Sequence, residues 1–206
     1  MSLKSELVYY SNLCYKCGFL SATDGNLSVR TNKNFILITP SNFCKGKIKL
    51  QHLIKADFKG KKIEGKGKVS SEFKLHKYIY ELRKDINAVV HTHPKFTTAF
   101  AAAGIGLDKV IFPEMYLKFG KIPLAEYATP STSEVPNSIK KYVKDNIAII
   151  LGNHGLVTLG RNLEEAYYNT EKVERLAEIT FYARILGGEK VLNKAQIKKL
   201  DLLKQN

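Results

Sequence analysis

The 206-residue sequence lacks several features that would assign it to particular classes of protein. No apolar stretch approaches the roughly 20 residues that a membrane-spanning helix needs. The amino-terminal segment has neither the apolar core nor the cleavage site of a signal peptide, so we expect a cytoplasmic protein. No internal repeat, low-complexity run or linker rich in proline, glycine or serine divides the chain. We therefore expect a single globular domain that spans residues 1–206.

Cysteine is scarce, with three residues in the chain. Cys14 and Cys17 have CxxC spacing, but a zinc ribbon needs a second such pair, which Cys44 alone cannot supply. A thioredoxin-like pair would follow a strand, whereas these two cysteines lie in a helical pattern of apolar residues. We expect both to be packing residues of that helix, and we expect no structural disulfide.

Acidic residues are also few, since 19 aspartates and glutamates face 33 lysines and arginines, and the formal net charge is +14. Such a balance is found in proteins that bind nucleic acid. Here the lysines are scattered over expected helix surfaces and the loop region 45–68, and no base-reading motif accompanies them. Attraction of a small anionic ligand explains the charge more simply, so we do not expect a nucleic-acid partner.

Apolar periodicity and turn residues predict helices and strands that are interspersed along the chain. The expected helices cover residues 3–17, 71–82, 95–103, 131–144, 163–185 and 195–203. The expected strands cover residues 27–30, 35–39, 53–57, 62–63, 88–90, 122–124, 147–151 and 155–160. Because this order lacks a regular βαβ alternation, it favours a mixed, largely antiparallel sheet with helices on both faces.

Two histidines follow the short apolar run at residues 88–90. The side chains of His91 and His93 point to the same face of a strand, so both imidazoles can converge on one ion. Imidazole is the usual neutral ligand of Zn²⁺, and a third protein ligand with an open position makes a catalytic site. An H-x-H pattern alone recurs by chance, and one histidine could instead be a core residue and the other a surface residue. His154 strengthens the metal hypothesis because it too follows an expected strand.

The triplet Ser70-Ser71-Glu72 precedes an amphipathic pattern that predicts a helix. Ser70 or Ser71 would be the N-cap, and Glu72 would lie in the first turn, where acidic residues are common. Ordinary capping is therefore one interpretation of the triplet. In the functional alternative, the hydroxyls and the free N–H groups at the helix start bind a phosphate, and Glu72 is a carboxylate held beside the metal.

Five short motifs resemble those of a known enzyme family in order and spacing. They are Gly25-Asn26-Leu27-Ser28, Thr39-Pro40-Ser41, Ser70-Ser71-Glu72, His91-Thr92-His93 and Asn153-His154-Gly155. On these motifs the chain resembles the class II aldolase/epimerase (adducin-like) family, typified by L-fuculose-1-phosphate aldolase, over residues 6–188. The resemblance implies an α/β protein with three α/β/α layers around a mixed, largely antiparallel central sheet.

The resemblance also implies roles for individual residues. Zn²⁺ would be held by His91, His93 and His154, with Glu72 as the general base and acid and as a further ligand when substrate is absent. The residues expected to bind a substrate phosphate are Gly25, Asn26, Ser41, Asn42, Ser70 and Ser71.

Three positions depart from the family's usual pattern or lie where that pattern varies. Asn42 stands where glycine is commoner, and asparagine tolerates a positive φ better than other non-glycine residues. Glu114 and Tyr116 lie in a variable region that contributes substrate-facing residues. Of these two we favour Glu114 as a residue that faces the substrate, because tyrosines are often partly buried for packing alone.

The activity implied by the resemblance is zinc-dependent cleavage of a phosphorylated ketose, similar to L-fuculose 1-phosphate, into dihydroxyacetone phosphate and a short aldehyde. Family members are typically homotetramers with the pocket at a subunit interface. The fuculose-phosphate enzymes also carry an interface tyrosine in a C-terminal tail, whereas this chain has no tyrosine after Tyr182.

Three alternatives remain open. Pentulose-5-phosphate 4-epimerases and methylthioribulose-1-phosphate dehydratases share much of the same frame. The 4-epimerases usually carry aspartate at the position of Glu72, which favours an aldolase here. A structural, adducin-like domain is the non-enzymatic alternative, and such domains lack the metal ligands that this sequence contains.

Overall fold

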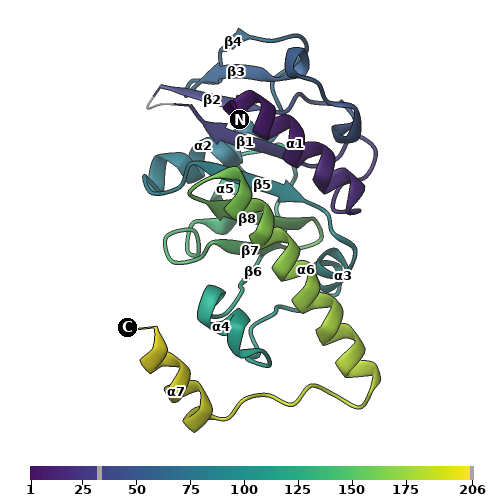
Figure 1. Cartoon of the computed structure of the whole chain (residues 1–206), viewed down its shortest axis with the longest axis vertical. Coiled ribbons are helices and arrows are strands. Elements are labelled where there is room, and N and C mark those ends of the chain that lie inside the picture. The colour runs from purple at the N-terminus through teal and green to yellow at the C-terminus, as the bar shows by residue number, and fades with distance from the viewer. Residues whose placement is uncertain (32–33, 205–206) are drawn as a thin grey trace.

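The computed structural model describes residues 1–31 and 34–204, and its centre is one twisted β-sheet (Figure 1). Within the described residues the sheet has eight strands, in the order β4-β3-β2-β1-β5-β8-β7-β6. The strands are β1 Asn26–Arg30, β2 Phe35–Ile38, β3 Ile54–Asp57, β4 Lys62–Glu64, β5 Ala88–Thr92, β6 Leu124–Ala125, β7 Ala148–Leu151 and β8 Gly155–Gly160. Every pair is antiparallel except β6 with β7, which confirms the expected mixed, largely antiparallel sheet.

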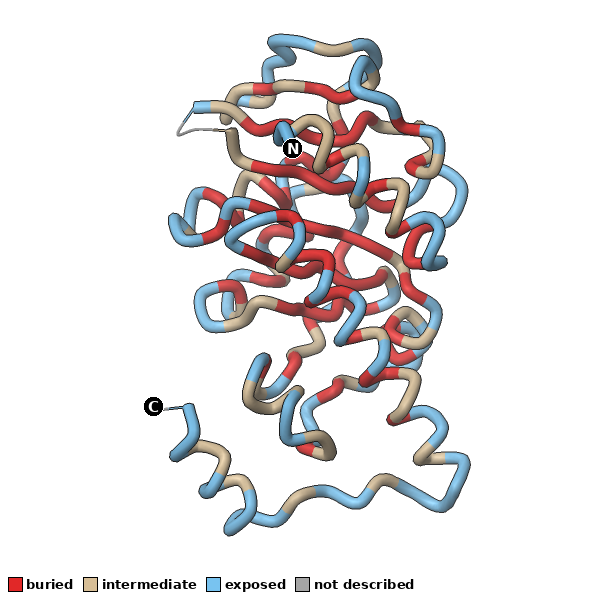
Figure 2. Tube along the Cα trace, in the orientation of Figure 1, coloured by how far each residue is buried: buried red, intermediate tan, exposed pale blue. Residues whose placement is uncertain are grey.

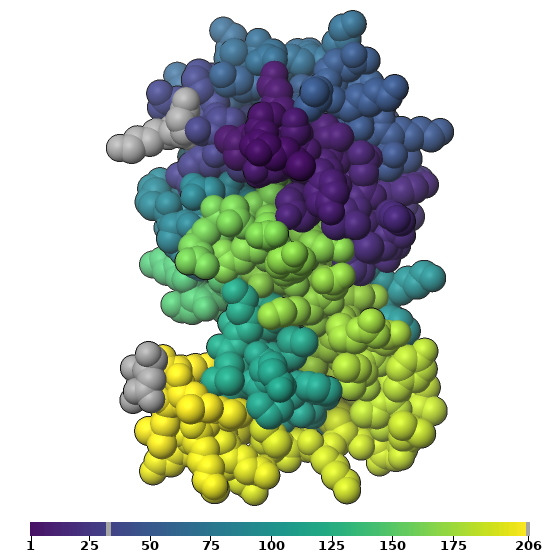
Figure 3. All heavy atoms as spheres, in the orientation of Figure 1, coloured from purple at the N-terminus to yellow at the C-terminus, as the bar shows by residue number. Residues whose placement is uncertain are grey.

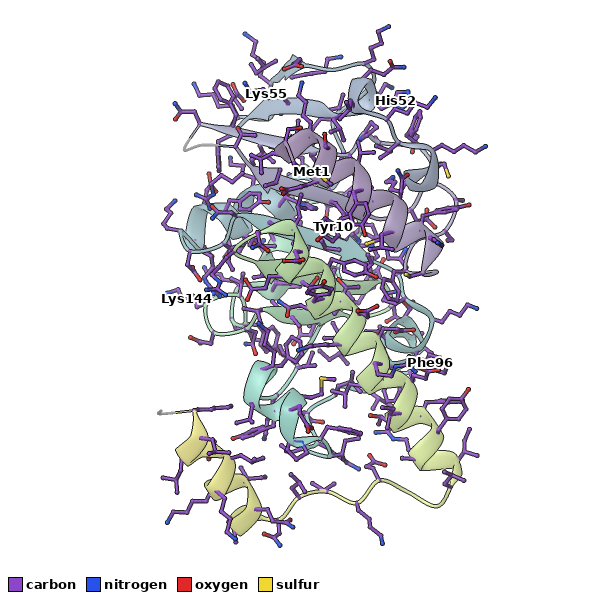
Figure 4. All side chains as sticks on the ribbon, viewed as in Figure 1. Met1, Tyr10, His52, Lys55, Phe96 and Lys144 are labelled. Carbon is purple, nitrogen blue, oxygen red and sulfur yellow. The ribbon has the colours of Figure 1, made fainter. Side chains whose placement is uncertain are left out.

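Helices cover both faces of this sheet and complete a three-layer arrangement. They are α1 Leu3–Lys16, α2 Phe73–Leu82, α3 Lys95–Ala102, α4 Pro113–Phe119, α5 Glu134–Ile139, α6 Leu163–Ile185 and α7 Lys194–Leu203. Alternate residues of β5 show the layering, because Val90 packs with α1 and α6 whereas Val89 packs with α2 and α5. On the first face lies Tyr10 of α1, which Figure 4 labels. Its ring centroid is 5.5 Å from that of Tyr167 of α6.

The central strands are buried along their length, as the red segments in Figure 2 show. The β1–β5 register sets Asn26 opposite His91, and the β5–β8 register sets His91 opposite Val157. The short β7–β8 connection, which carries His154, therefore lies at the same end of the sheet as the start of β1 and the end of β5. Polar side chains from three separate strand ends are brought together there.

The C-terminal helix α7 packs beside α4, at one end of the molecule (Figure 3). Tyr116 joins the two helices, since its hydroxyl donates to Oδ1 of Asp201 at 2.7 Å and Lys204 lies over its ring. Among the described residues, none of the helices has the length and apolar character needed to cross a membrane.

Several expected boundaries differ from the observed ones. Helix α2 begins at Phe73, so the prediction that Ser70 or Ser71 is its N-cap is wrong, and Glu72 takes the cap position with φ −96° and ψ 15°. Of the helix expected at 131–144, only α5 is observed as α-helix. The residues after α5 form tighter turns, as in the hydrogen bond from Tyr142 N–H to Ile139 O.

Other differences are smaller. The strand expected at 122–124 is observed as the two-residue β6, and helix α4 was not expected. Cys14 is buried in the core as predicted, whereas Cys17 is exposed at the end of α1, so the expectation of packing was wrong for Cys17. All three cysteines are free thiols, as expected.

Candidate metal centre

Three histidines that are distant in sequence meet at the end of β5. Nε2 of His91 lies 3.2 Å from Nε2 of His93 and 3.3 Å from Nε2 of His154. Three nitrogens bound at about 2.0–2.1 Å to one tetrahedral ion would be separated by roughly 3.3 Å. The spacing of the imidazoles therefore fits three ligands of a single ion, and one candidate ligand atom from each of the three residues lies within 4.8 Å of the others.

The hydrogen bonding of His91 favours the tautomer that a metal needs. Its Nδ1 lies 3.0 Å from the carbonyl oxygen of Leu156, which can only accept, so Nδ1 carries a proton and Nε2 is the atom left for a metal. Burial lowers the pKa of His91, but the charge and hydrogen bond of Glu72 outweigh burial and raise that pKa, so without a metal Nε2 also carries a proton and donates to Oε2 of Glu72. A bound ion would displace this second proton. Burial, followed by the charge of His91, lowers the pKa of His93 to about 3 and that of His154 to about 4. Both rings are therefore neutral at ordinary pH, as metal ligands must be.

Glu72 completes the cluster from the start of α2. Its Oε2 lies 3.0 Å from Nε2 of His91, and its Oε1 lies 3.5 Å from Nε2 of His154. Burial alone would raise the pKa of Glu72, but the charge and hydrogen bond of His91, with the hydrogen bond from Asn26, hold that pKa below its usual range. Oε1 is buried and accepts no hydrogen bond from the described residues. An orphaned carboxylate oxygen beside three imidazoles is a donor set that a bound cation would satisfy.

A chain of buried hydrogen bonds runs behind Glu72. Nδ2 of Asn26 donates to Oε2 of Glu72 at 2.9 Å, and Oδ1 of Asn26 accepts from Nε2 of His76. Nδ1 of His76 must then accept from the Ser28 hydroxyl at 2.6 Å, and Ser28 accepts from the Tyr80 hydroxyl at 2.8 Å. Because each donor points towards the carboxylate, the chain fixes both the position and the ionised form of Glu72.

Helix geometry explains why this series of hydrogen bonds can form. Glu72, His76 and Tyr80 are four residues apart, so their side chains lie along one face of α2. Burial, with a smaller contribution from His91, lowers the pKa of His76 to about 3, which keeps the ring neutral. His76 was not among the residues expected at the site, although a polar residue at i+4 from Glu72 within an apolar helix face was a usable signal.

A pocket of about 350 Å³ opens beside the cluster. The expected phosphate-binding residues that line it are Gly25, Asn26, Ser41, Asn42, Ser70 and Ser71. Asn42 has φ 52°, the left-handed conformation that glycine or asparagine adopts most readily. A Cβ at Gly25 would lie 2.7 Å from the carbonyl oxygen of His91, so this position requires glycine.

Two expected substrate contacts differ in the structure. The side chain of Asn26 is bound to Glu72 and His76, which leaves one amide N–H for a ligand. Glu114 is exposed on α4 and does not line the pocket, so the structure does not bring Glu114 to the cluster. Conversely, Lys45 lines the pocket although its sequence context suggested an exposed loop.

A larger cavity, of about 1030 Å³, lies elsewhere, between α1 and the far ends of β1 and β5. The described residues that line it include no histidine, cysteine or serine. Among those described residues it therefore has no counterpart of the histidine cluster at the end of β5, and the smaller pocket is the candidate site.

Comparison with known proteins agrees with this geometry. The family model described as Class II Aldolase and Adducin N-terminal domain matches residues 5–181. The chain belongs to this family. Among curated class II aldolase relatives, an L-fuculose phosphate aldolase of Methanococcus maripaludis is 35% identical, and the match covers 89% of this chain and 98% of that protein.

Relatives that are named for a different reaction, a decarboxylation, match over a similar length of the chain. A 3-oxo-tetronate 4-phosphate decarboxylase of Escherichia coli strain K12 is 30% identical, over 92% of this chain and 90% of that protein. A solved structure named L-fuculose 1-phosphate aldolase has a TM-score of 0.89 and 30% identity, and the match covers 98% of this chain and 94% of that one. The class II aldolase fold is thereby confirmed, and relatives that are aldolases and a decarboxylase support an enzyme rather than a structural domain.

Proposed function

We propose that this protein is a zinc-dependent aldolase that cleaves a phosphorylated ketose to dihydroxyacetone phosphate and a short aldehyde. The observation that carries the proposal is the meeting of three imidazole Nε2 atoms beside the orphaned oxygen of Glu72. The relatives named L-fuculose phosphate aldolase support this reaction class. A sugar phosphate substrate would also suit a strongly basic protein.

His91, His93 and His154 would hold the metal. The spacing of the three Nε2 atoms and the neutral rings of His93 and His154 fit zinc, and the fourth position would remain open to the substrate. A bound zinc ion would act as a Lewis acid that stabilises negative charge on the substrate's carbonyl and neighbouring hydroxyl oxygens.

Glu72 would move the proton at the reacting carbon. When the carbon–carbon bond breaks, the hydroxyl group that becomes the aldehyde loses its proton and the carbon that keeps the electron pair gains one, and in the reverse direction that carbon loses a proton. Asn26 and His91 fix Oε2 of Glu72, whereas Oε1 accepts no hydrogen bond from the described residues and is free for this transfer. Glu72 is among the residues that line the pocket, so it lies beside the space that a ligand would fill.

The phosphate would bind among the serines and the loop residues that line the pocket. Ser41, Ser70 and Ser71 line the pocket and carry hydroxyls, and Gly25 and Asn42, which lie in two separate loops, have the positive φ angles that are typical of backbone anion sites. These groups would anchor the substrate so that its carbonyl reaches the histidine cluster.

Decarboxylation of a 3-oxo acid phosphate is a second candidate. The relatives named 3-oxo-tetronate 4-phosphate decarboxylase match more than nine-tenths of this chain. Both reactions break a carbon–carbon bond and leave negative charge next to a carbonyl, so the same cluster could serve either one. The 4-epimerase and dehydratase alternatives have the metal site in common but require different substrates.

We also propose a homotetramer, as the family resemblance implies. Large apolar side chains at the end of α6 and beyond it support a subunit contact, because they are exposed in the isolated chain. They are Phe181, Tyr182, Ile185 and Leu186. Light scattering coupled to size-exclusion chromatography would report a mass of four chains, and a monomeric mass would contradict this proposal.

A substrate panel tests the reaction. The zinc-loaded protein would be incubated with ketose 1-phosphates, with ribulose 5-phosphate and with 3-oxo-tetronate 4-phosphate, each with and without a chelator. We expect chelator-sensitive release of dihydroxyacetone phosphate from at least one ketose 1-phosphate. Release of carbon dioxide alone would select the decarboxylase, and conversion of ribulose 5-phosphate to its epimer would select an epimerase.

A further inference from the structure

A buried lysine lies in the candidate pocket. Lys45 belongs to the short 3₁₀ turn Lys45–Lys47 and is 2% exposed. The turn packs tightly on α1, since a Cβ on Gly46 would lie 2.3 Å from the ring of Tyr15. Lysine is almost never fully buried unless its charge is paired, so its position calls for an explanation.

The ammonium group of Lys45 is incompletely satisfied. It donates to the carbonyl oxygen of Thr23, and it forms no ion pair with any residue that the structure describes. An ammonium has three N–H donors, so two of them are available to a ligand. Burial lowers the pKa of Lys45 to about 8, and Asp24 and Glu72 only partly oppose that effect. A buried, unpaired cation is costly, and such groups occur mainly at functional sites.

The pocket itself needs a positive charge at this point. Ser41, Ser70 and Ser71 can donate hydrogen bonds to a phosphate, but they cannot neutralise its charge of about −2 at neutral pH. Among the described residues that line the pocket, Lys45 is the one lysine or arginine. It also follows the loop that carries Ser41 and Asn42 by three residues, so the hydroxyl and the cation come from one segment of the chain.

We propose that Lys45 binds the phosphate group of the substrate through the N–H donors that Thr23 leaves free. The inference rests on the proposed function only in that the substrate is a phosphate ester. Lys45 is thus a substrate-binding residue that supplies the counter-charge to the phosphate, while the serines and backbone amides supply orientation.

The test compares zinc-loaded wild type with K45M and with K47M as a matched control. Methionine keeps most of the apolar stem of Lys45, and Lys47 is an exposed lysine of the same turn. Calorimetry would measure binding of inorganic phosphate, dihydroxyacetone phosphate and the uncharged dihydroxyacetone. We expect K45M to lose about 10- to 100-fold in affinity for both phosphates, as for loss of a charged hydrogen bond, with dihydroxyacetone binding and zinc content unchanged. K47M should bind all three as the wild type does.

Thermal unfolding without ligand separates binding from a structural role. If Lys45 serves only to tether Thr23, K45M should have a lower Tm than the wild type and bind charged and uncharged probes equally poorly. If it binds phosphate, K45M should unfold at the same or a higher temperature, because a buried unpaired charge has been removed. Undiminished phosphate binding by K45M, or no phosphate binding by the wild type, would overturn the inference.

The outcome for Lys45 can be told apart from the outcome for the aldolase. Selective loss of phosphate affinity in K45M, in a protein that cleaves no ketose phosphate, would keep the role of Lys45 and reject the aldolase. Zinc-dependent cleavage of a ketose phosphate by K45M, with the KM of the wild type for that substrate, would keep the aldolase and reject the role of Lys45.

Discussion

The side-chain amide of Asn26 links the carboxylate of Glu72 to the buried ring of His76. Its Nδ2 donates to Oε2 of Glu72 at 2.9 Å, and its Oδ1 accepts from Nε2 of His76. The family resemblance implies a phosphate contact for Asn26, and one N–H of the amide remains for that contact. The two bonds to protein atoms give Asn26 a further role, which is to hold the carboxylate of Glu72 in place beside the imidazoles.

Replacement of Asn26 should therefore reduce turnover more than it reduces metal binding. In N26A the carboxylate of Glu72 loses a fixed donor, and we expect kcat to fall by about 10- to 100-fold with zinc content unchanged. Steady-state kinetics with metal analysis checks this, with N137A as the control because Asn137 is exposed on α5. Wild-type kcat in N26A would mean that Asn26 does not position Glu72.

Loss of the His76 ring should destabilise the fold as well as the site. H76L would leave Oδ1 of Asn26 and the hydroxyl of Ser28 without their buried partner, which costs about 1–3 kcal/mol for each unsatisfied group. Chemical denaturation would measure the free energy of unfolding. Combining H76L with S28A should cost less than the sum of the two single changes, because they break the same chain. Strict additivity would contradict the chain of hydrogen bonds.

Replacement of Glu72 should affect proton transfer but not metal binding, unlike replacement of a histidine. E72Q keeps the shape of the side chain and can still accept from Asn26, but it cannot carry a proton at neutral pH. We expect zinc binding to survive and kcat to fall by roughly 10²- to 10⁴-fold, the usual contribution of general acid–base catalysis. Zinc titration and a progress curve on one E72Q sample would check both, and retained turnover would exclude the proton-transfer role.

The burial of Lys45 predicts a pH dependence of stability. The pKa of Lys45 is about 8 in the folded protein and about 10.5 in the unfolded chain, so between these values the unfolded chain binds more protons. Folded stability must then rise with pH across that window, and the destabilisation, on the order of 3 kcal/mol, is fully present below pH 8.

Denaturation of the wild type and K45M in phosphate-free buffer, from pH 7 to pH 10, measures this effect. The wild type should be the less stable protein at pH 7, and the gap should narrow steadily towards pH 10. A gap that stays constant over this range would show that Lys45 is not desolvated as the structure indicates.

Much of the fold follows from local patterns in the sequence. The period of apolar residues predicts helix 163–185 with the observed bounds, and the strands expected at 53–57 and 62–63 are observed as β3 and β4. The convergence of the His91 and His93 side chains follows from strand geometry. His154 follows a second apolar run, which suggests that it lies at the same edge of the sheet as the other two histidines. These features depend on residues close together in the chain, which is why the sequence reveals them.

The features that the sequence analysis missed depend on distant contacts. The sequence places Glu72 in the first turn of a helix, where acidic residues are common. In the structure α2 begins one residue later, and Asn26 and His91 hold the carboxylate of Glu72. Lys45 is one lysine among many in a basic segment, and its burial depends on residues distant in the chain, since its turn packs on α1 and its ammonium group donates to the carbonyl oxygen of Thr23. Glu114 follows Pro113 at the start of α4, so its acidic side chain suits the first turn of that helix and does not reach the pocket.

The metal content of the purified protein and of H91A tests the central claim most directly. His91 lies between the other two rings and is fixed by Leu156, so its removal should abolish binding even though His93 and His154 remain. Elemental analysis after dialysis against zinc should give one zinc ion per wild-type chain and none per H91A chain, with both proteins folded by circular dichroism. Equal zinc in the two proteins, or none in the wild type, would contradict a shared metal site at these three histidines.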